Sequence, residues 1–171
     1  ALHNSHYGER CFIIGNGPSL LDTDLSMLAD EITFSLNRGY LYYDRIGKPC
    51  SYHVAVNQLV VEQFNKEIAA LPNIKFVTWG QRHYFNPQAD VIYISYPSGR
   101  DLPRFSIDPT RDIWPGATVT YVALQLAYYL GFSKVILIGV DHRFHTKGKP
   151  HKMVVSTDSD KNHFDSNYFG K

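Results

Sequence analysis

Cysteines and long apolar runs are both scarce in this 171-residue sequence. Its two cysteines, Cys11 and Cys50, lie in or beside short apolar runs, which is typical of reduced, packed thiols and excludes a framework of several disulfides. No run approaches the roughly 18 apolar residues that cross a bilayer, and the N-terminus has no apolar signal-peptide core. We therefore expect a cytoplasmic protein without a transmembrane segment.

An excess of charge of one sign is also lacking. Seventeen Lys and Arg residues stand against sixteen Asp and Glu residues, so the formal net charge is +1. With no basic block early in the chain, nucleic acid is not expected as a partner. Only residues 142–171 depart from this balance, with six Lys or Arg and four His against three Asp. This segment is interpreted either as a binding region for a phosphate-rich ligand or as a solvated loop.

The composition otherwise indicates a folded protein. Apolar residues make up 44% of the chain and charged residues 19%, which excludes a largely disordered or collagen-like chain. At this length we expect one domain over residues 1–171, with a substantial hydrophobic core. The last residues, NYFGK, close no predicted strand or helix, so we expect the parent protein to continue past Lys171.

Six short apolar runs separated by turn residues predict six β-strands, at residues 11–15, 31–37, 51–57, 74–80, 90–97 and 134–141. Several runs are apolar on both alternating sets of positions, as in parallel strands that are covered on both faces. Apolar stripes at helical spacing predict helices over 58–71 and 116–130, the second entered at Pro115 and ended by Gly131. The alternation predicts a single doubly wound, mostly parallel α/β sheet of Rossmann-like type, with helices on both faces and a loop-rich segment over 141–171.

Polar residues close four of the predicted strands: Asn16, Asn37, Asn57 and Asp141. In an open α/β sheet, ligands bind beyond the carboxyl ends of the strands, at a switch in strand order. Asn side chains suit ribose hydroxyls, a base edge or a phosphate oxygen. Asn also closes strands for a local reason, because it accepts left-handed backbone geometry. With three of them in this pattern, we expect a shared nucleotide site.

The stretch GNGPS, residues 15–19, follows the first strand. Gly15 and Gly17 permit close approach, while Pro18 and Ser19 begin a helix whose free N–H groups would suit a phosphate. The stretch matches neither the dinucleotide-binding G-x-G-x-x-G motif nor a P-loop. A purely structural turn is the alternative.

Several motifs together carry a family resemblance: FIIGNGPSL, the Asn residues that close FSLN and VAVN, and PGATVTYVALQLAYYLGFSKVILIGVD. Over most of residues 9–141 they resemble the MptE-like family, formerly a domain of unknown function, which includes motility-associated flagellin-modification proteins. They are also similar to bacterial lipooligosaccharide sialyltransferases.

The sialyltransferase resemblance implies a glycosyltransferase that acts in surface glycan or flagellin modification and transfers a sugar to a glycan or small-molecule acceptor. It implies that Asn16, Asn37 and Asn57 hold a nucleotide-sugar donor, with Gly116 near the phosphate. Arg143 stands, with Lys147, where that family has a phosphate-binding Tyr pair. The resemblance implies that His163 is the general base of the family. In an alternative match, Asn167 occupies the position of that His, and the base would be absent. Such an enzyme requires no metal or other cofactor.

The MptE-like resemblance implies instead an ATP-dependent 6-hydroxymethylpterin diphosphokinase, with Asp141 as a ligand of Mg²⁺. A non-catalytic nucleotide-binding module is a third hypothesis. Considered on chemistry alone, an imidazole suits proton removal from an acceptor hydroxyl near neutral pH, which makes His163 a candidate base, although a loop His is also commonly solvated. Asp141 suits either a ligand or a capping role. We prefer the glycosyltransferase; the sequence fixes neither the sugar, the acceptor nor the oligomeric state.

Overall fold

The computed structural model describes residues 2–98, 104–141, 162–166 and 168–169. Six strands form one sheet: β1 (Arg10–Ile14), β2 (Thr33–Leu36), β3 (Tyr52–Ala55), β4 (Ile74–Thr78), β5 (Val91–Ile94) and β6 (Lys134–Ile138). Their order is β5-β4-β3-β2-β1-β6, and every neighbouring pair is parallel. All six predicted strands are confirmed. The predicted runs extend up to three residues further because they include the polar residues that leave the sheet to form turns.

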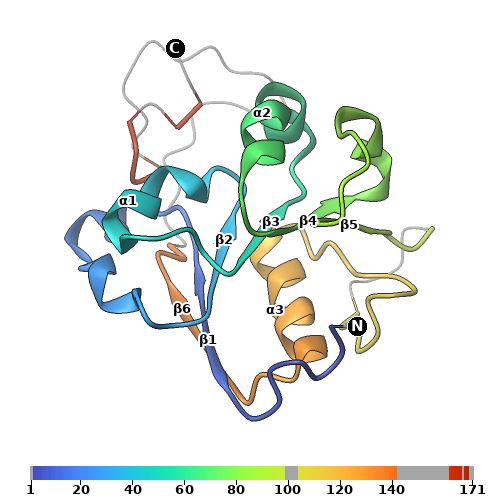
Figure 1. The fold of residues 1–171 in the computed structure, drawn as a ribbon, viewed down its shortest axis with the longest axis horizontal. Coiled ribbons are helices and arrows are strands. Elements are labelled where there is room, and N and C mark those ends of the chain that lie inside the picture. Colours follow the sequence, from blue (N-terminus) through green and yellow to red (C-terminus); the bar gives the residue numbers. More distant parts are fainter. Residues whose placement is uncertain (1, 99–103, 142–161, 167, 170–171) are drawn as a thin grey trace.

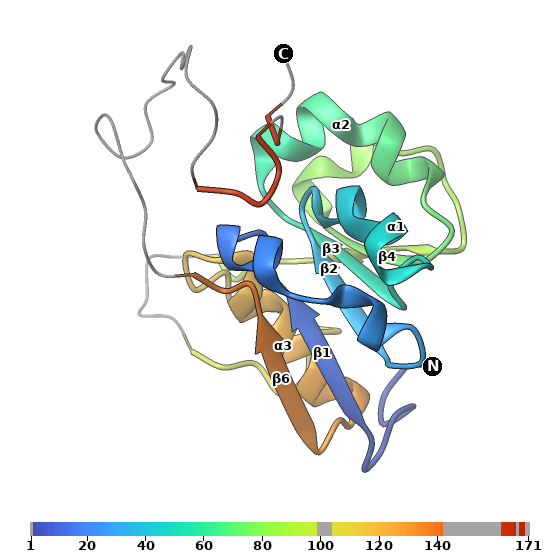
Figure 2. The same cartoon turned by 90° about the vertical axis from the view of Figure 1, so that its left-hand side faces the viewer.

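Helices cover both faces of the sheet, as predicted (Figures 1 and 2). On one face, α3 (Val119–Leu130) packs against β1, β2 and β3. The other face carries α1 (Tyr43–Ile46), α2 (Gln58–Ala70) and the 3₁₀ helices η1 (Pro18–Asp22), η2 (Leu25–Leu28), η3 (Gly39–Tyr42) and η4 (Trp79–Tyr84). Alternate residues of each strand enter the two cores: Ile13 packs on the α3 side, whereas Ile14 packs on the opposite side. The fold is therefore a doubly wound, Rossmann-like α/β sheet.

The two long helices agree with the sequence prediction, apart from the start of α3. That helix begins at Val119 with Thr118 as its N-cap, three residues after the predicted start at 116. Gly116 and Ala117 have φ angles of 52° and 61°, and a left-handed backbone cannot continue a right-handed helix. At the other end Gly131, with a φ of 91°, caps α3 as predicted.

The strand order reverses between β1 and β6. From β1 to β5, each new strand is added on the same side of the sheet. The chain then returns through α3 along one face of the sheet, and β6 pairs with the other side of β1. Ile14 and Ile138 are register partners at the carboxyl ends of these two strands. The switch point of the sheet therefore lies where residues 15–19 leave β1 and residues 139–141 leave β6.

A row of polar side chains crosses the face that carries α1 and α2. Ser35, His53 and Lys75 are register partners on β2, β3 and β4, and all three are fully buried. Ser35 Oγ lies 2.8 Å from His53 Nδ1. Burial, and secondarily the charge of Lys75, lower the pKa of the His53 imidazole to about 3. The histidine is therefore neutral in the folded protein at pH 7.

Candidate functional site

The loops that leave β1 and β6 are in close contact at the switch point. A Cβ atom on Gly15 would lie 2.3 Å from the carbonyl oxygen of Gly139, and one on Gly17 would lie 2.3 Å from Asp141 Oδ2. The Gly17 N–H donates to the Gly139 carbonyl at 2.9 Å. Both glycines in the GNGPS stretch thus permit the close approach of another part of the same chain.

Asp141 is held by Ser19. Its Oδ2 accepts the Ser19 N–H at 2.8 Å, and its Oδ1 accepts the Ser19 hydroxyl at 2.6 Å. The expected helix after Gly17 is only the five-residue 3₁₀ helix η1, which is too short for an appreciable helix dipole. The expectation of free N–H groups at this helix start is therefore wrong for Ser19, because the Asp141 carboxylate already occupies its N–H.

Asn16 and Asn37 lie at the carboxyl ends of neighbouring strands. The side-chain Nδ2 of Asn16 donates to the carbonyl of Leu36, the residue before Asn37, at 2.8 Å. Asn37 has a φ of 51°, so it also has the left-handed geometry that favours Asn at a strand end. The Oδ1 atoms of both residues are buried and accept no hydrogen bond within the described part of the chain. Two unpaired acceptors therefore lie at one edge of the sheet.

Asn57 lies at the next strand end along the same edge, but its side chain caps a helix. It is exposed, and its Oδ1 accepts the Val60 N–H at 3.2 Å as the N-cap of α2. Gly116 precedes α3, and the crossover brings the N-terminus of that helix to the carboxyl edge of the sheet. Arg143, Lys147 and Asn167 lie outside the described residues.

The described part of 162–169 lies over the ends of β1 and β2, as the red segment in Figure 2 shows. The Phe164 N–H donates to the Asn16 carbonyl at 3.0 Å, and the Phe164 ring packs against Tyr42. Tyr168 is only 2% exposed. Its hydroxyl accepts Asn16 Nδ2 at 3.0 Å and the Arg38 main-chain N–H at 3.2 Å. A segment far along the chain therefore covers the strand ends.

This segment also brings His163 to the same edge. The His163 ring stacks in parallel on the Tyr168 ring, with the ring centroids 3.9 Å apart and the planes 4° from parallel. His163 is half-buried and precedes Phe164, which is bonded to Asn16. The structure thus gathers His163, Asn16 and Asn37 at neighbouring positions.

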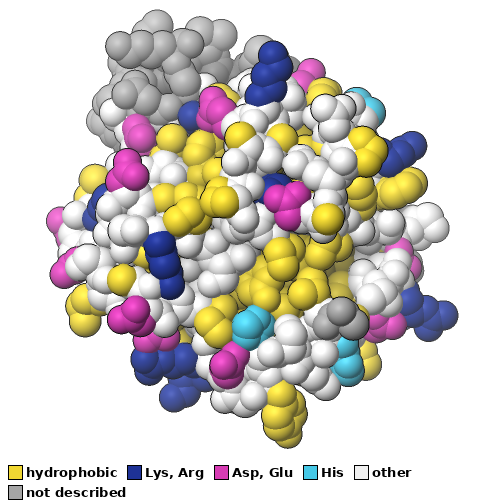
Figure 3. Space-filling view, in the orientation of Figure 1, with side chains coloured by type: hydrophobic (Ala, Val, Ile, Leu, Met, Phe, Trp, Pro, Cys, Tyr) yellow, Lys and Arg dark blue, Asp and Glu magenta, His cyan; other side chains and the backbone are white. Residues whose placement is uncertain are grey.

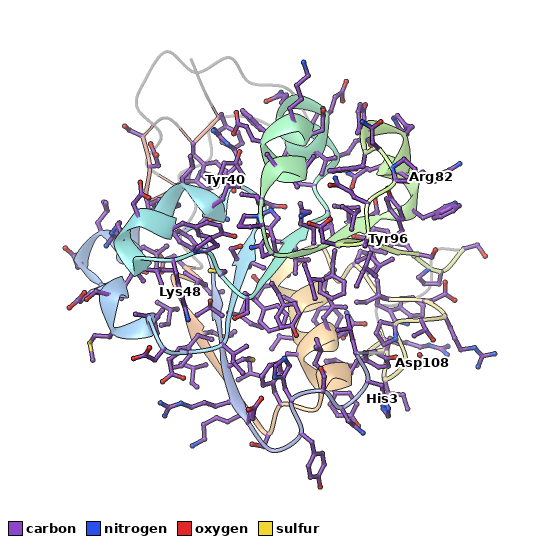
Figure 4. The ribbon with its side chains drawn as sticks, in the orientation of Figure 1. His3, Tyr40, Lys48, Arg82, Tyr96 and Asp108 are labelled. Carbon is purple, nitrogen blue, oxygen red and sulfur yellow. The ribbon has the colours of Figure 1, made fainter. Side chains whose placement is uncertain are left out.

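Arg38 is a member of this cluster that sequence reasoning missed. Its side chain is 8% exposed, and its guanidinium lies 3.8 Å from the centroid of the Phe64 ring and donates to the Tyr168 carbonyl. Its Nε donates to the Tyr40 hydroxyl at 3.1 Å; Figure 4 shows Tyr40 between α1 and α2. Burial, with a hydrogen bond to Glu67, raises the pKa of Tyr40. In the sequence, the position of Arg38 directly after the strand-closing Asn37 is the feature that could have indicated its role.

A shallow groove of about 520 Å³ lies elsewhere, between the second half of α2 and residues 84–88. Its lining residues are Asn65, Lys66, Ala69, Ala70, Tyr84, Asn86, Pro87 and Gln88. It contains no carboxylate and none of the buried unpaired atoms, so we place the candidate site at the strand ends instead. On the face shown in Figure 3, Lys and Arg side chains are interspersed with Asp and Glu and form no patch of one charge.

Comparisons with protein-family models, curated proteins and solved structures give no match to this chain. Within the described ranges, no three His, Cys, Asp or Glu side chains cluster in a way that would hold a metal ion. No helix in those ranges has the length and apolar composition to span a bilayer. The residues at the strand ends and their geometry therefore carry the information about function.

Proposed function

We propose that this protein is a nucleotide-dependent transferase, most specifically a glycosyltransferase with a nucleotide-sugar donor. The observation that carries the proposal is the pair of buried amide oxygens of Asn16 and Asn37 at adjacent strand ends, which accept no hydrogen bond from the residues that the structure describes. A buried acceptor without a partner costs about 1–3 kcal/mol. A ligand that presents O–H or N–H donors, such as a ribose or a base amino group, would recover that free energy.

In the proposed reaction, Asn16 and Asn37 orient the donor and His163 acts on the acceptor. The imidazole of His163 takes the proton of an acceptor hydroxyl, whose oxygen then forms a bond to the anomeric carbon of the sugar. The bond from that carbon to the phosphate oxygen breaks, and the nucleotide leaves with the electron pair. The parallel stack on Tyr168 fixes the plane of the His163 ring at the strand ends, which supports this assignment.

The contacts of Asp141 favour this reaction over the diphosphokinase alternative. A Mg²⁺ ion that serves phosphoryl transfer is usually held by one or two carboxylates together with substrate phosphates. Both oxygens of Asp141 already accept hydrogen bonds from Ser19, so this carboxylate has a structural role that joins the loops after β1 and β6. Each oxygen keeps a lone pair for a metal, but within the described ranges no group of three His, Cys, Asp or Glu side chains accompanies it.

A thermal-shift screen of nucleotides and nucleotide-sugars, with and without Mg²⁺, tests the proposal. A nucleotide at about 100 times its Kd stabilises the folded state by about 2.7 kcal/mol, which raises the Tm of a domain of this size by about 5–10 °C. We expect this shift without Mg²⁺.

Variants of Asn37 separate the amide from the backbone geometry. Asn37→Gly keeps a left-handed backbone accessible but removes the Oδ1 acceptor, so it should abolish the shift. Asn65→Ala removes a half-buried amide on α2, away from the strand ends, and should leave the shift intact.

Different failures have different meanings. Absence of any shift in the wild-type protein contradicts nucleotide binding, and a shift that requires ATP with Mg²⁺ supports the diphosphokinase. Nucleotide binding without turnover or donor hydrolysis, whatever acceptor is supplied, identifies a binding module without catalysis.

A further inference from the structure

The hydroxyl oxygen of Tyr168 lies between two hydrogen-bond donors from neighbouring strand ends. Asn16 Nδ2 donates from the end of β1 at 3.0 Å, and the Arg38 main-chain N–H donates from just beyond β2 at 3.2 Å. Neither donor belongs to the segment that carries Tyr168. Two N–H groups that converge on one oxygen atom form a defined oxygen-binding position.

We infer that these two donors form a subsite for a ligand hydroxyl or carbonyl oxygen, and that the Tyr168 hydroxyl is its internal occupant, which a ligand must displace. The inference rests on the proposed nucleotide site, and it adds a competitor within the chain to that site. Neither Arg38 nor Tyr168 was among the residues expected from the sequence.

The unpaired acceptors at the same strand ends support displacement. The Tyr168 hydroxyl pairs the Asn16 amide N–H group, whereas the Oδ1 atoms of Asn16 and Asn37, at the same two strand ends, have no partner among the described residues. A ligand that carries both an accepting oxygen and neighbouring O–H groups, such as a ribose diol, would pair the donors and the acceptors together. Tyr168 is therefore an incomplete substitute for such a ligand.

The chemistry of the two donors favours a neutral oxygen over a phosphate. An amide N–H and a main-chain N–H carry no formal charge. Among the described residues of the cluster, the permanent positive charge is that of the Arg38 guanidinium, which donates to the Tyr168 carbonyl and the Tyr40 hydroxyl. A phosphate at this position would lack the charge-assisted contacts that usually hold it.

The segment is also held by contacts that do not involve the Tyr168 hydroxyl. The Phe164 N–H donates to the Asn16 carbonyl, and the Arg38 guanidinium donates to the Tyr168 carbonyl. Tyr168→Phe keeps these main-chain contacts and the aromatic ring that stacks on His163, and it removes only the competing oxygen. This single-atom change is therefore a direct test of the subsite.

The matched control is Tyr42→Phe. Tyr42 lies in the same buried cluster, and its hydroxyl donates to the Ile14 carbonyl at 3.0 Å without an observed bond to Asn16 or Arg38. Both variants lose one buried phenol oxygen, so a similar fall in Tm is expected. Only the loss at Tyr168 should change ligand binding.

The experiment measures the Kd of both variants and of the wild-type protein by calorimetry, for the nucleotides found in the thermal-shift screen. Loss of one net hydrogen bond shifts an equilibrium about fivefold, and the Tyr168 hydroxyl accepts two, so Tyr168→Phe should bind about 5- to 25-fold more tightly, whereas Tyr42→Phe should match the wild type. Amide exchange by NMR should show faster exchange of the Arg38 N–H in Tyr168→Phe, even without ligand.

Three results would overturn the inference, and they are distinguishable. If Tyr168→Phe binds as the wild type does, or more weakly, the phenol is not a competitor, and the proposed function stands. An equal gain in affinity in Tyr42→Phe means that general loosening of the cluster is responsible. If no protein binds any nucleotide although the Arg38 N–H exchanges faster, the proposed function is wrong and the inference falls with it.

Discussion

The buried histidine of the polar row makes the stability of this protein depend on pH in a defined direction. His53 is fully buried, and its pKa is about 3 in the folded state against about 6.5 in an unfolded chain. Between these two values the unfolded chain binds a proton that the folded protein does not bind. The free energy of unfolding therefore falls as the pH falls from 6.5 towards 3.

The size of the effect follows from the same two values. Each pH unit within this window contributes about 1.4 kcal/mol for one proton. Between pH 6.5 and pH 5, His53 alone should therefore remove about 2 kcal/mol of stability. Asp24, Asp90 and Asp108 have lowered pKa values and titrate in more acidic solution, so measurements at pH 5 and above avoid their contribution, and comparison with a His53 variant isolates the histidine.

Urea denaturation at pH 7, 6 and 5 measures this dependence in the wild-type protein and in His53→Leu. The variant removes the titrating ring, while Ser35 Oγ keeps its contacts with the Tyr43 hydroxyl and the Tyr52 carbonyl. The pH dependence of His53→Leu should be smaller by about 2 kcal/mol, whatever its stability at pH 7. His83→Leu removes an exposed histidine and should retain the wild-type dependence. A His53→Leu curve parallel to the wild-type curve would refute a buried, neutral His53.

Two further predictions concern the loops that frame the site. Gly17→Ala would place a Cβ atom 2.3 Å from Asp141 Oδ2, so it should separate the two loops and lower the free energy of unfolding in urea by about 1–3 kcal/mol. Gly80→Ala is the control, because a Cβ atom there meets no atom within 4 Å. Equal losses of unfolding free energy in the two variants would contradict the close contact between Gly17 and Asp141. Gln125 is fully buried; its Oε1 accepts the N–H groups of Ser106 and Trp114, which lie in the loop before α3. Gln125→Leu leaves both N–H groups unpaired and should speed their amide exchange at least tenfold, whereas unchanged exchange would show that this side chain does not hold the loop.

Much of the fold was predictable because its signals are local. Six apolar runs predicted the six strands, and the apolar character of several runs on both alternating sets of positions predicted a parallel sheet covered on both faces. The start of α3 was wrong because the apolar spacing of a helix does not reveal the left-handed backbone at Gly116 and Ala117. The η1 helix was overestimated for a similar reason, since Pro18 suits the first turn of a short 3₁₀ helix as well as that of a long α-helix.

The strand-end asparagines were identified as a set, but their individual roles were not predictable. Asn16 and Asn37 keep a buried, unpaired oxygen, whereas the oxygen of Asn57 caps α2. The three residues follow their strands in the same way in the sequence. The described contacts of the segment that contains Tyr168 are made with Asn16 and with Arg38, next to Asn37, and this covering requires the chain to return across the sheet.

By itself, the sequence determined which strands and helices follow one another along the chain and the type of residue at each strand end. Both depend on neighbours within a few positions. Tertiary structure decided which of these residues meet. Ser19 pairs with Asp141 across 122 positions, and Asn16 pairs with Tyr168 across 152. Such contacts depend on strand order and on the crossover through α3, so no local pattern encodes them. The partners of Arg38 are likewise set by packing, and this packing places its main-chain N–H opposite the Tyr168 hydroxyl.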